Sequence, residues 1–356
     1  LADKAAAKLG ISQDSIRRKN FIQPKQFPYT TPLGMTYDSG EYESLMDKAI
    51  SRSNWVDFEN KRIKSSKQGK LRGIGMSYYI EACGGGPTEF TSLFINEKGQ
   101  LKIKSGSQNN GQGQETTFAQ LAADALGMEI DDIDILMGDT DEIPSGMGTG
   151  GSRALAAGGS AIISTAEELI NNGKKTASNL MEAAEIDIDY ADGSYNIAGT
   201  DRSLTLTDVA KASFDDSQRT AGVEPGLLTI SEQVANQATF PNGCHICEIE
   251  IDKETGEIEI INYVIEDDIG RILNPLMLEG QILGGAAQGL GQALYEEAVY
   301  DKDGQLVNGS FMDYVLPRAD NVPSFDFHYT EVPSPSNRIG AKGAGEAGTI
   351  GSTPAI

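Results

Sequence analysis

The sequence is poor in the residues from which proteins build metal cages and disulfide frameworks. Its 356 residues include three cysteines, Cys83, Cys244 and Cys247, and two histidines, His245 and His328. Three cysteines are too few for a disulfide-built secreted fold, so we expect a reducing, cytoplasmic location. With only two histidines, a histidine-based metal site or a Ser-His-Asp triad is not favoured.

The sequence also lacks long hydrophobic runs and an excess of positive charge. No stretch approaches the length of a membrane span, and no signal peptide is visible. Basic residues number 29 against 52 acidic ones, giving a net charge of -23. This charge argues against nucleic acid or anionic lipid as a partner, and its simplest consequence is solubility. The first residue is Leu1 and the chain ends soon after Glu346, so we expect a piece of a longer polypeptide.

Local patterns predict an α+β protein that begins with a helical and extended segment. Strong helix formers occupy residues 2–9, and Gly10 is the expected C-terminal cap. Ser12 and Ser39 are the predicted N-caps of the next two helices. The basic stretch 61–70 is predicted to be a flexible connector.

From Leu71 onward the pattern changes to two similar halves. Each half shows a hairpin, a polar loop, a stretch of glutamine and glycine, and a helix. We therefore predict a connecting segment over 1–70 and two subdomains over 71–220 and 221–356. Because one hairpin followed by a helix is a common unit, chance similarity is the alternative explanation.

Two glycine-rich loops, each between a predicted strand and a predicted helix, are the first candidates for ligand binding. The first runs from Gly111 to Thr116 and suits an anion with a polar ring system, because glycines permit close approach and the helix start presents free N–H groups. Its alternative is a plain turn with Thr116 as N-cap. The second runs from Gly148 to Arg153 and offers a backbone nest, a hydroxyl and an arginine fork for phosphate oxygens. Its alternative is a flexible loop with a solvated arginine.

The stretch from Gly343 to Glu346 is the third candidate. A carboxylate among glycine and alanine, with no basic neighbour close by, is typical of a desolvated base. The alternative is a surface glutamate in a loose tail.

Two further patterns are weaker. The cysteines of Cys244-His245-Ile246-Cys247 lie three apart in a predicted strand, so they face opposite ways and are expected to be packed thiols. Asp267 and Asp268 could bind a divalent cation, but no third ligand at a suitable spacing is evident.

Together, the three candidate stretches, in this order, resemble the molybdenum hydroxylases of the xanthine dehydrogenase and aldehyde oxidoreductase family. The match is to the C-terminal half of the molybdopterin-binding large subunit. It also includes "RGIGMSYYIEACGGGP" and "DDIGRILNPLMLEGQILGGAAQGLGQAL", so it involves nearly the whole chain.

The resemblance implies an oxidoreductase that hydroxylates an aldehyde or N-heteroaromatic carbon with oxygen from water. It implies a molybdopterin cofactor, often as the cytosine dinucleotide, with molybdenum held by the pterin dithiolene and not by protein side chains. Glu346 would be the active-site base. The cofactor would contact three sets of residues: Gln112, Gly113, Gln114, Glu115 and Thr116; Gly150, Gly151, Ser152 and Arg153; and Gly343, Ala344 and Gly345. Electrons would leave through 2Fe-2S clusters and FAD on partner chains or domains.

Two departures from the family bear on the substrate and on the subunit make-up. Carbon monoxide dehydrogenases have a tyrosine before Gly-Ser-Arg, where this chain has Gly150, and this lowers the expectation of carbon monoxide as substrate. The loop that shapes their substrate site would precede residue 1. Some family members split the molybdenum subunit into two polypeptides, which would supply the missing half as a partner. A cofactor-gripping or assembly subunit without catalysis is the alternative function.

Overall fold

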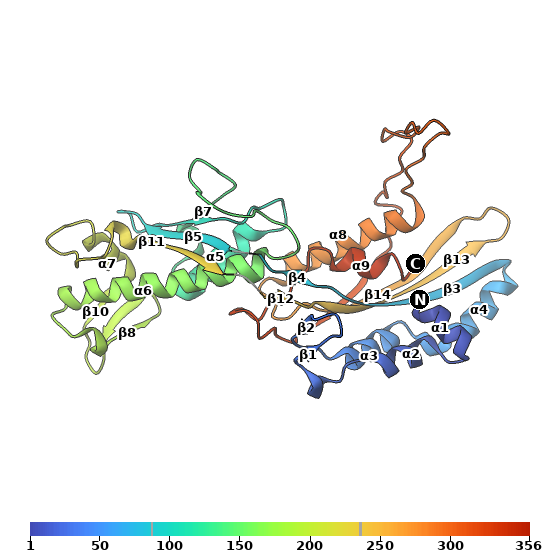
Figure 1. Cartoon of the computed structure of the whole chain (residues 1–356), viewed down its shortest axis with the longest axis horizontal. Helices are drawn as coiled ribbons and strands as arrows, with labels where there is room; N and C mark the ends of the chain where they lie inside the picture. Colours follow the sequence, from blue (N-terminus) through green and yellow to red (C-terminus); the bar gives the residue numbers. More distant parts are fainter. Residues whose placement is uncertain (87, 235–236) are drawn as a thin grey trace. The chain divides into compact units, whose positions relative to one another are not determined.

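A computed structural model describes residues 1–86, 88–234 and 237–356 and shows a mixed α/β fold (Figure 1). The chain forms two compact units. Unit 1 comprises Leu1–Cys83, Thr239–Ser336 and Gly340–Ile356, and unit 2 comprises Gly84–Ala238 and Asn337–Ile339. Pro87, at the end of the segment "RGIGMSYYIEACGGGP", and Ala235 and Asn236 lie outside the described residues.

Four helices open unit 1: α1 (Ala2–Leu9), α2 (Gln13–Asn20), α3 (Tyr42–Arg52) and α4 (Phe58–Lys67), with a small hairpin of β1 (Tyr29–Thr30) and β2 (Thr36–Tyr37) after α2. Gly10 ends α1 in the left-handed conformation, and Ser12 caps α2 through its side chain, as predicted. Two predictions were wrong. Glu41, not Ser39, is the N-cap of α3, and most of the expected connector is helical because α4 extends to Lys67.

The main sheet of unit 1 has the order β15-β14-β13-β3, formed by β3 (Lys70–Ile80), β13 (Asn242–Asp252), β14 (Ile258–Asp268) and β15 (Asp326–Thr330). β13 and β14 are the predicted hairpin. β3 pairs antiparallel with β13, and β15 pairs parallel with β14. A parallel partner requires a crossover, which α8 (Pro275–Leu294) supplies.

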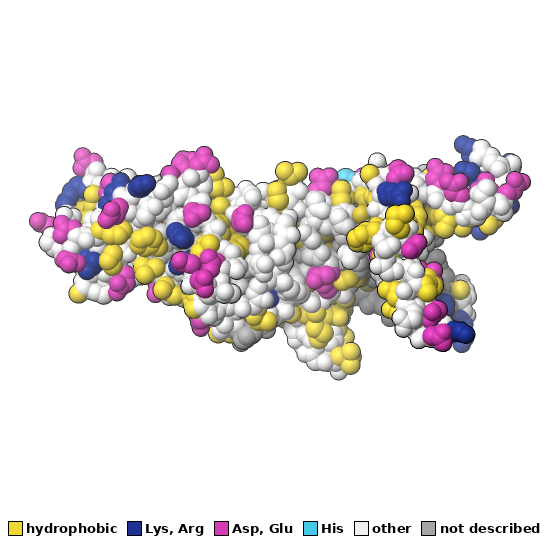
Figure 2. Space-filling view, turned by 90° about the horizontal axis from the view of Figure 1, so that it is seen from above, with side chains coloured by type: hydrophobic (Ala, Val, Ile, Leu, Met, Phe, Trp, Pro, Cys, Tyr) yellow, Lys and Arg dark blue, Asp and Glu magenta, His cyan; other side chains and the backbone are white. Residues whose placement is uncertain are grey.

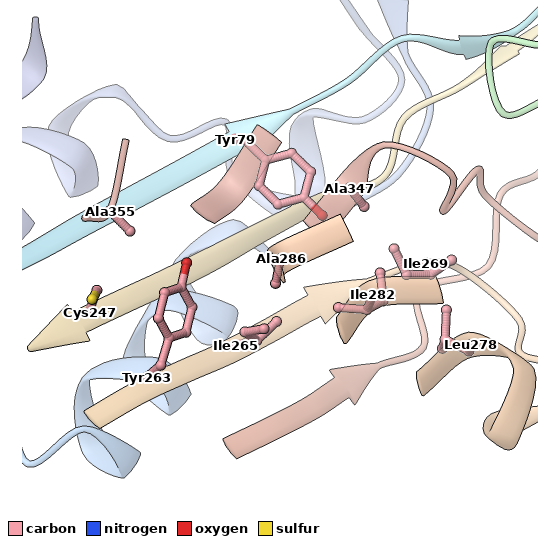
Figure 3. Packing of buried hydrophobic residues seen from close by; sticks show 10 residues of the cluster. All are labelled: Tyr79, Cys247, Tyr263, Ile265, Ile269, Leu278, Ile282, Ala286, Ala347 and Ala355. Carbon is pink, nitrogen blue, oxygen red and sulfur yellow. The ribbon is translucent and has the colours of Figure 1, made fainter. Parts of the chain in front are cut away.

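Helices cover both faces of this sheet. On one face, α8 and α9 (Ala347–Ser352) bury a cluster of ten residues that Figure 3 labels: Tyr79, Cys247, Tyr263, Ile265, Ile269, Leu278, Ile282, Ala286, Ala347 and Ala355. On the other face, Met46 and Ala49 of α3 pack against Met76, Cys244 and Ile246. The strands therefore contribute apolar residues to cores on both faces of the sheet.

Unit 2 is built on a sheet with the order β11-β5-β6-β7, from β5 (Thr88–Ile95), β6 (Leu101–Ser105), β7 (Ile133–Met137) and β11 (Thr229–Val234). α5 (Gln114–Leu126) connects β6 to its parallel partner β7, and α6 (Ser160–Leu180) follows a single π-helical turn, Leu155–Gly159. A smaller sheet, β8 (Ile188–Ala191), β9 (Ser194–Ile197) and β10 (Ser203–Thr205), leads into α7 (Leu206–Ala212). β4 (Cys83–Gly84) pairs with β12 (Ala238–Thr239).

The predicted pair of hairpin-plus-helix halves is confirmed as a shared topology. In each unit a hairpin is flanked by an antiparallel strand on one side and, after a helix, by a parallel strand on the other. The flanking antiparallel strands come from unexpected places in the sequence. β3 belongs to the sheet of the second hairpin, and β11 belongs to the sheet of the first. The assignment of 71–220 and 221–356 as cofactor-binding subdomains stays a prediction.

The surface carries both signs of charge. On the face drawn in Figure 2, acidic side chains are dispersed, and Lys and Arg side chains lie among them. Across the described ranges, no helix combines the length and the apolar character that a membrane crossing would need.

Candidate functional site

The loop before α5 in unit 2 is shaped by its own side chains. The Gln112 side chain accepts a hydrogen bond from the Asn110 N–H at 2.5 Å and donates one to the Gln108 carbonyl at 3.3 Å. Gly113 is the N-cap in a left-handed conformation with φ of 85°, so α5 begins at Gln114 and not after Thr116. The cap predicted at Thr116 was therefore wrong. Glu115 and Thr116 lie exposed in the first turn.

The second glycine-rich loop packs directly against the first. The Thr149 hydroxyl donates to the Gln108 carbonyl at 2.5 Å, and the Gly148 N–H donates to the Gly106 carbonyl at 3.0 Å. A Cβ added at Gly146 would overlap the backbone of Gly106, so this close approach requires glycine. Because Gln112 of the first stretch also donates to the Gln108 carbonyl, the two candidate stretches meet at this oxygen in unit 2.

Arg153 is buried below these loops and is not a solvated side chain. Its guanidinium forms an ion pair with Glu89 at 2.8 Å and donates to the carbonyls of Gly85 and Thr88, both at 3.2 Å. Ser107, between β6 and the first loop, donates to the other oxygen of Glu89 at 2.8 Å. Glu89 therefore ties the arginine to the first loop. The sequence did not identify Glu89 as a candidate, because the local strand pattern around it does not indicate an ion pair with the distant Arg153.

The third stretch, Gly343 to Glu346, lies in unit 1. The Gly343 N–H donates to the Thr239 hydroxyl at 3.2 Å, and the Gln281 amide of α8 donates to the Gly345 carbonyl at 3.1 Å. Ala344 packs against the core under α8 and α9. Glu346 is the N-cap residue of α9, and its side chain is exposed in this chain.

A second carboxyl group, Glu81, interacts with Glu346. Glu81 follows β3 directly, and its N–H donates to the Pro241 carbonyl at 3.0 Å. Burial raises the pKa of Glu81 to about 7; a hydrogen bond with Cys83 opposes this shift, whereas the charge and hydrogen bonding of Glu346 add to it. Perturbed acids cluster at functional sites. The sequence alone gave no reason to pair residues so far apart.

A buried polar cluster lies on the same face of the sheet, under α9. His245 and Asp267 are fully buried with 3.3 Å between Nε2 and Oδ1, and the Tyr263 hydroxyl lies 3.2 Å from His245 Nδ1. A Cβ added at Gly351 of α9 would overlap the imidazole ring. This histidine thus supports the helix that begins at Glu346.

The expectation for the cysteine pattern is confirmed, and Asp268 has an ion-pair partner. Cys244 and Cys247 are buried free thiols on opposite faces of the sheet, in two different core clusters. Asp268 forms a buried ion pair with Lys342 at 2.6 Å; burial raises the pKa of this carboxyl, and the Lys342 ammonium opposes that shift. Among the residues described, no group of three His, Cys, Asp or Glu side chains is arranged to hold a metal ion.

Comparison with known families and structures gives a consistent result. A family model described as the molybdopterin cofactor-binding domain matches residues 48–323. The chain is 34% identical to the gamma subunit of the 6-hydroxypseudooxynicotine dehydrogenase complex of Paenarthrobacter nicotinovorans, over 99% of this chain and 45% of that protein. It is also 34% identical to the carbon monoxide dehydrogenase large chain of Hydrogenophaga pseudoflava, over 99% of this chain and 46% of the relative.

The fold has a close counterpart among crystal structures. The quinoline 2-oxidoreductase of Pseudomonas putida 86 superimposes with a TM-score of 0.92 at 32% identity, over 100% of this chain and 47% of that one. The chain thus spans less than half the length of each of these three relatives.

Proposed function

The chain belongs to the molybdopterin cofactor-binding domain family, and from this premise we propose that it forms the cofactor-holding part of a molybdenum hydroxylase. In this proposal the two glycine-rich loops of unit 2 hold molybdopterin as the cytosine dinucleotide, and Glu346 of unit 1 is the base. The observation that carries the proposal is that Gln112 of the first loop and Thr149 of the second both donate to the Gln108 carbonyl.

The residues present fit such a cofactor. A Cβ added at Gly111, Gly150 or Gly151 would meet nothing within 4 Å, so the backbone there is open to a ligand. The Oε1 atom of Gln114 is buried and has no hydrogen-bond partner among the described residues. Free N–H groups at the start of α5 suit a pyrophosphate. The donors are amides, hydroxyls and backbone groups, which suits a cofactor that brings its own metal ligands.

Each proposed residue has a task that its contacts support. Gln112, Gly113, Gln114, Glu115 and Thr116 would contact the cofactor from the start of α5, and Gly150, Gly151 and Ser152 would do so from the second loop. Arg153 would act through its ion pair with Glu89, which fixes the backbone of that loop. Gly343, Ala344 and Gly345 would place the cofactor beside Glu346.

The bound cofactor would supply Lewis acidity and capacity for two electrons. The role of this chain is to orient the cofactor and to accept a proton. Glu346 would accept that proton at a carboxylate oxygen, from the water-derived oxygen that is to be transferred.

The substrate class and the partners are part of the proposal. We infer an aldehyde or an N-heteroaromatic carbon as the site of hydroxylation, because Gly150 departs from the tyrosine expected for carbon monoxide oxidation. The other half of the molybdenum subunit, a 2Fe-2S subunit and an FAD subunit would complete the complex. The three cysteines form no disulfide with one another, which supports a cytoplasmic location.

Replacing Glu346 with glutamine in the complete complex tests the proposed base. Assays would use benzaldehyde, quinoline and carbon monoxide with a dye as electron acceptor. The variant is expected to lose roughly 10²- to 10⁴-fold in turnover, the usual contribution of a general base. Its molybdenum and cytidine nucleotide contents should not change.

The matched control is Glu257→Gln, at the exposed turn between β13 and β14, which should leave turnover unchanged. Full turnover by Glu346→Gln would remove the base from the proposal. A complex that holds the cofactor but oxidises none of the three compounds would instead support the alternative, a non-catalytic subunit that binds the cofactor. Oxidation of carbon monoxide alone would favour a carbon monoxide dehydrogenase.

A further inference from the structure

Glu81 and Glu346 form a pair of acids at one end of the unit 1 sheet. Tyr79, two residues before Glu81, and Ala347, directly after Glu346, belong to the same buried cluster and lie close together in Figure 3. The chain is held here because the Glu81 N–H donates to the Pro241 carbonyl. The two carboxyl groups interact by charge and by a hydrogen bond.

The two acids differ in their exposure to solvent. The Oε2 atom of Glu81 is buried and has no hydrogen-bond partner among the described residues, whereas the Glu346 side chain is exposed. A buried carboxylate loses hydration, so burial favours its protonated form. Two adjacent carboxyl groups with unequal burial share one proton unequally. Burial and the neighbouring Glu346 therefore favour the protonated form of Glu81.

The groups around Glu81 do not neutralise a charge on it. Those that interact with it are Glu346, the Cys83 thiol and the Tyr79 hydroxyl, whose own pKa is raised well above its usual value, first by burial and then by Asp267. Tyr79 in turn packs against the His245 ring, with 5.8 Å between the ring centroids, and interacts with Asp267. Burial is the largest cause of the raised pKa of Glu81, about 7.

We propose that Glu81 is a positioning residue that keeps its proton and donates it as a hydrogen bond to the Glu346 carboxylate. The pair then carries one negative charge, located on the residue assigned as the base. This inference rests on the proposed function of Glu346. As pH rises through about 7, Glu81 ionises, so the hydrogen bond is lost and a second negative charge appears beside Glu346.

Two substitutions in the complete complex distinguish the ionisation of Glu81 from its role as a hydrogen-bond donor. Glu81→Gln retains an N–H donor that cannot ionise, whereas Glu81→Ala removes the donor. With the benzaldehyde, quinoline or carbon monoxide assay that shows turnover, the unsubstituted complex should lose kcat/KM as pH rises through about 7. Glu81→Gln should keep its activity at low pH and lose this inflection.

Glu81→Ala should lower kcat roughly tenfold or more across the range, as expected for a lost hydrogen bond to a charged group. Glu257→Gln is again the matched control and should retain the original profile. An unchanged inflection in Glu81→Gln, or full kcat in Glu81→Ala, would overturn the proposal.

An infrared measurement provides a readout that needs no turnover. Difference spectra of the complete complex between about pH 6 and about pH 8 should show a protonated carboxyl band that disappears as pH rises. The band should be absent from Glu81→Gln and present in Glu257→Gln. A band that persists in Glu81→Gln would overturn the assignment to Glu81. Turnover of Glu346→Gln tests the proposed base, whereas the pH profile and infrared band of Glu81→Gln test the proposed carboxyl pair. The two proposals can therefore fail independently.

Discussion

The partners of Arg153 could be predicted from the sequence only in part. The sequence identified an arginine in a glycine-rich loop, suited to phosphate oxygens, with a solvated arginine as the alternative. In the structure its fork binds protein oxygens, those of Glu89, Gly85 and Thr88 of unit 2. Glu89 could not be chosen from the sequence, because the pairing depends on how the chain folds between residues 89 and 153.

This ion pair predicts a large effect on stability. Glu89→Gln would leave the guanidinium of Arg153 buried without its counter-charge, because both side chains are almost fully buried. Breaking one partner of a buried pair costs about 3–5 kcal/mol of unfolding free energy. Urea unfolding of the purified protein would measure the loss.

The matched control is Glu142→Gln, which removes the exposed partner of Lys104 in the same unit. Exposed ion pairs contribute little, so its urea midpoint should stay close to that of the unsubstituted protein. Equal effects of the two substitutions would show that the buried pair is not the anchor of the second loop.

At the scale of elements, helix starts and hairpins were predictable where the signal is local. Ser12, the predicted N-cap, does cap α2 through a side-chain hydrogen bond. The start of α3 was misplaced because its N-cap is Glu41, a residue type that N-cap preferences do not favour. The start of α5 was misplaced because its N-cap is Gly113, in a left-handed conformation. The helix α4 was missed because its sequence is polar and its periodicity is weak.

The helix α9 gives a prediction about the element that carries Glu346. Gly351 faces the His245 ring so closely that an added methyl group would overlap it. Gly351→Ala should therefore displace α9 and destabilise the fold by about 1–3 kcal/mol, the usual cost of overpacking a core. The measurement is the unfolding free energy in urea, together with turnover in the complete complex.

Gly280→Ala in α8 is the matched control, because nothing lies within 4 Å of its added methyl group. It should stabilise the protein by up to about 1 kcal/mol through helix propensity. A stable and fully active Gly351→Ala variant would contradict the support of α9 by His245.

At the scale of the whole chain, the order of elements was predictable but the strand partners were not. Periodicity located β3 and both hairpins, since each is a local pattern. The pairing of β3 with β13, and of β11 with β5, joins segments far apart in sequence. Such pairing depends on the collapse of the folded chain, and no local pattern records it.

Fragments of the chain test these pairings directly. A fragment of residues 71–220 lacks β11, so β5 would lose the partner that it contacts from Leu93 to Thr88, and it contains β3 without β13. A fragment of residues 84–238 keeps all four strands of the unit 2 sheet. An exposed, unpaired strand is a site of aggregation.

Circular dichroism would follow the unfolding of both fragments in urea. We expect one sharp transition for the 84–238 fragment, and aggregation or gradual unfolding for the 71–220 fragment. The 84–238 fragment lacks Ile339, which is buried in unit 2, so its midpoint should be lower than that of a version carrying residues 337–339 on a short linker. Cooperative unfolding of the 71–220 fragment alone would show that the boundary expected at 220 marks an independent subdomain. It would also show that β11 is dispensable, which six consecutive residue pairs with β5 argue against.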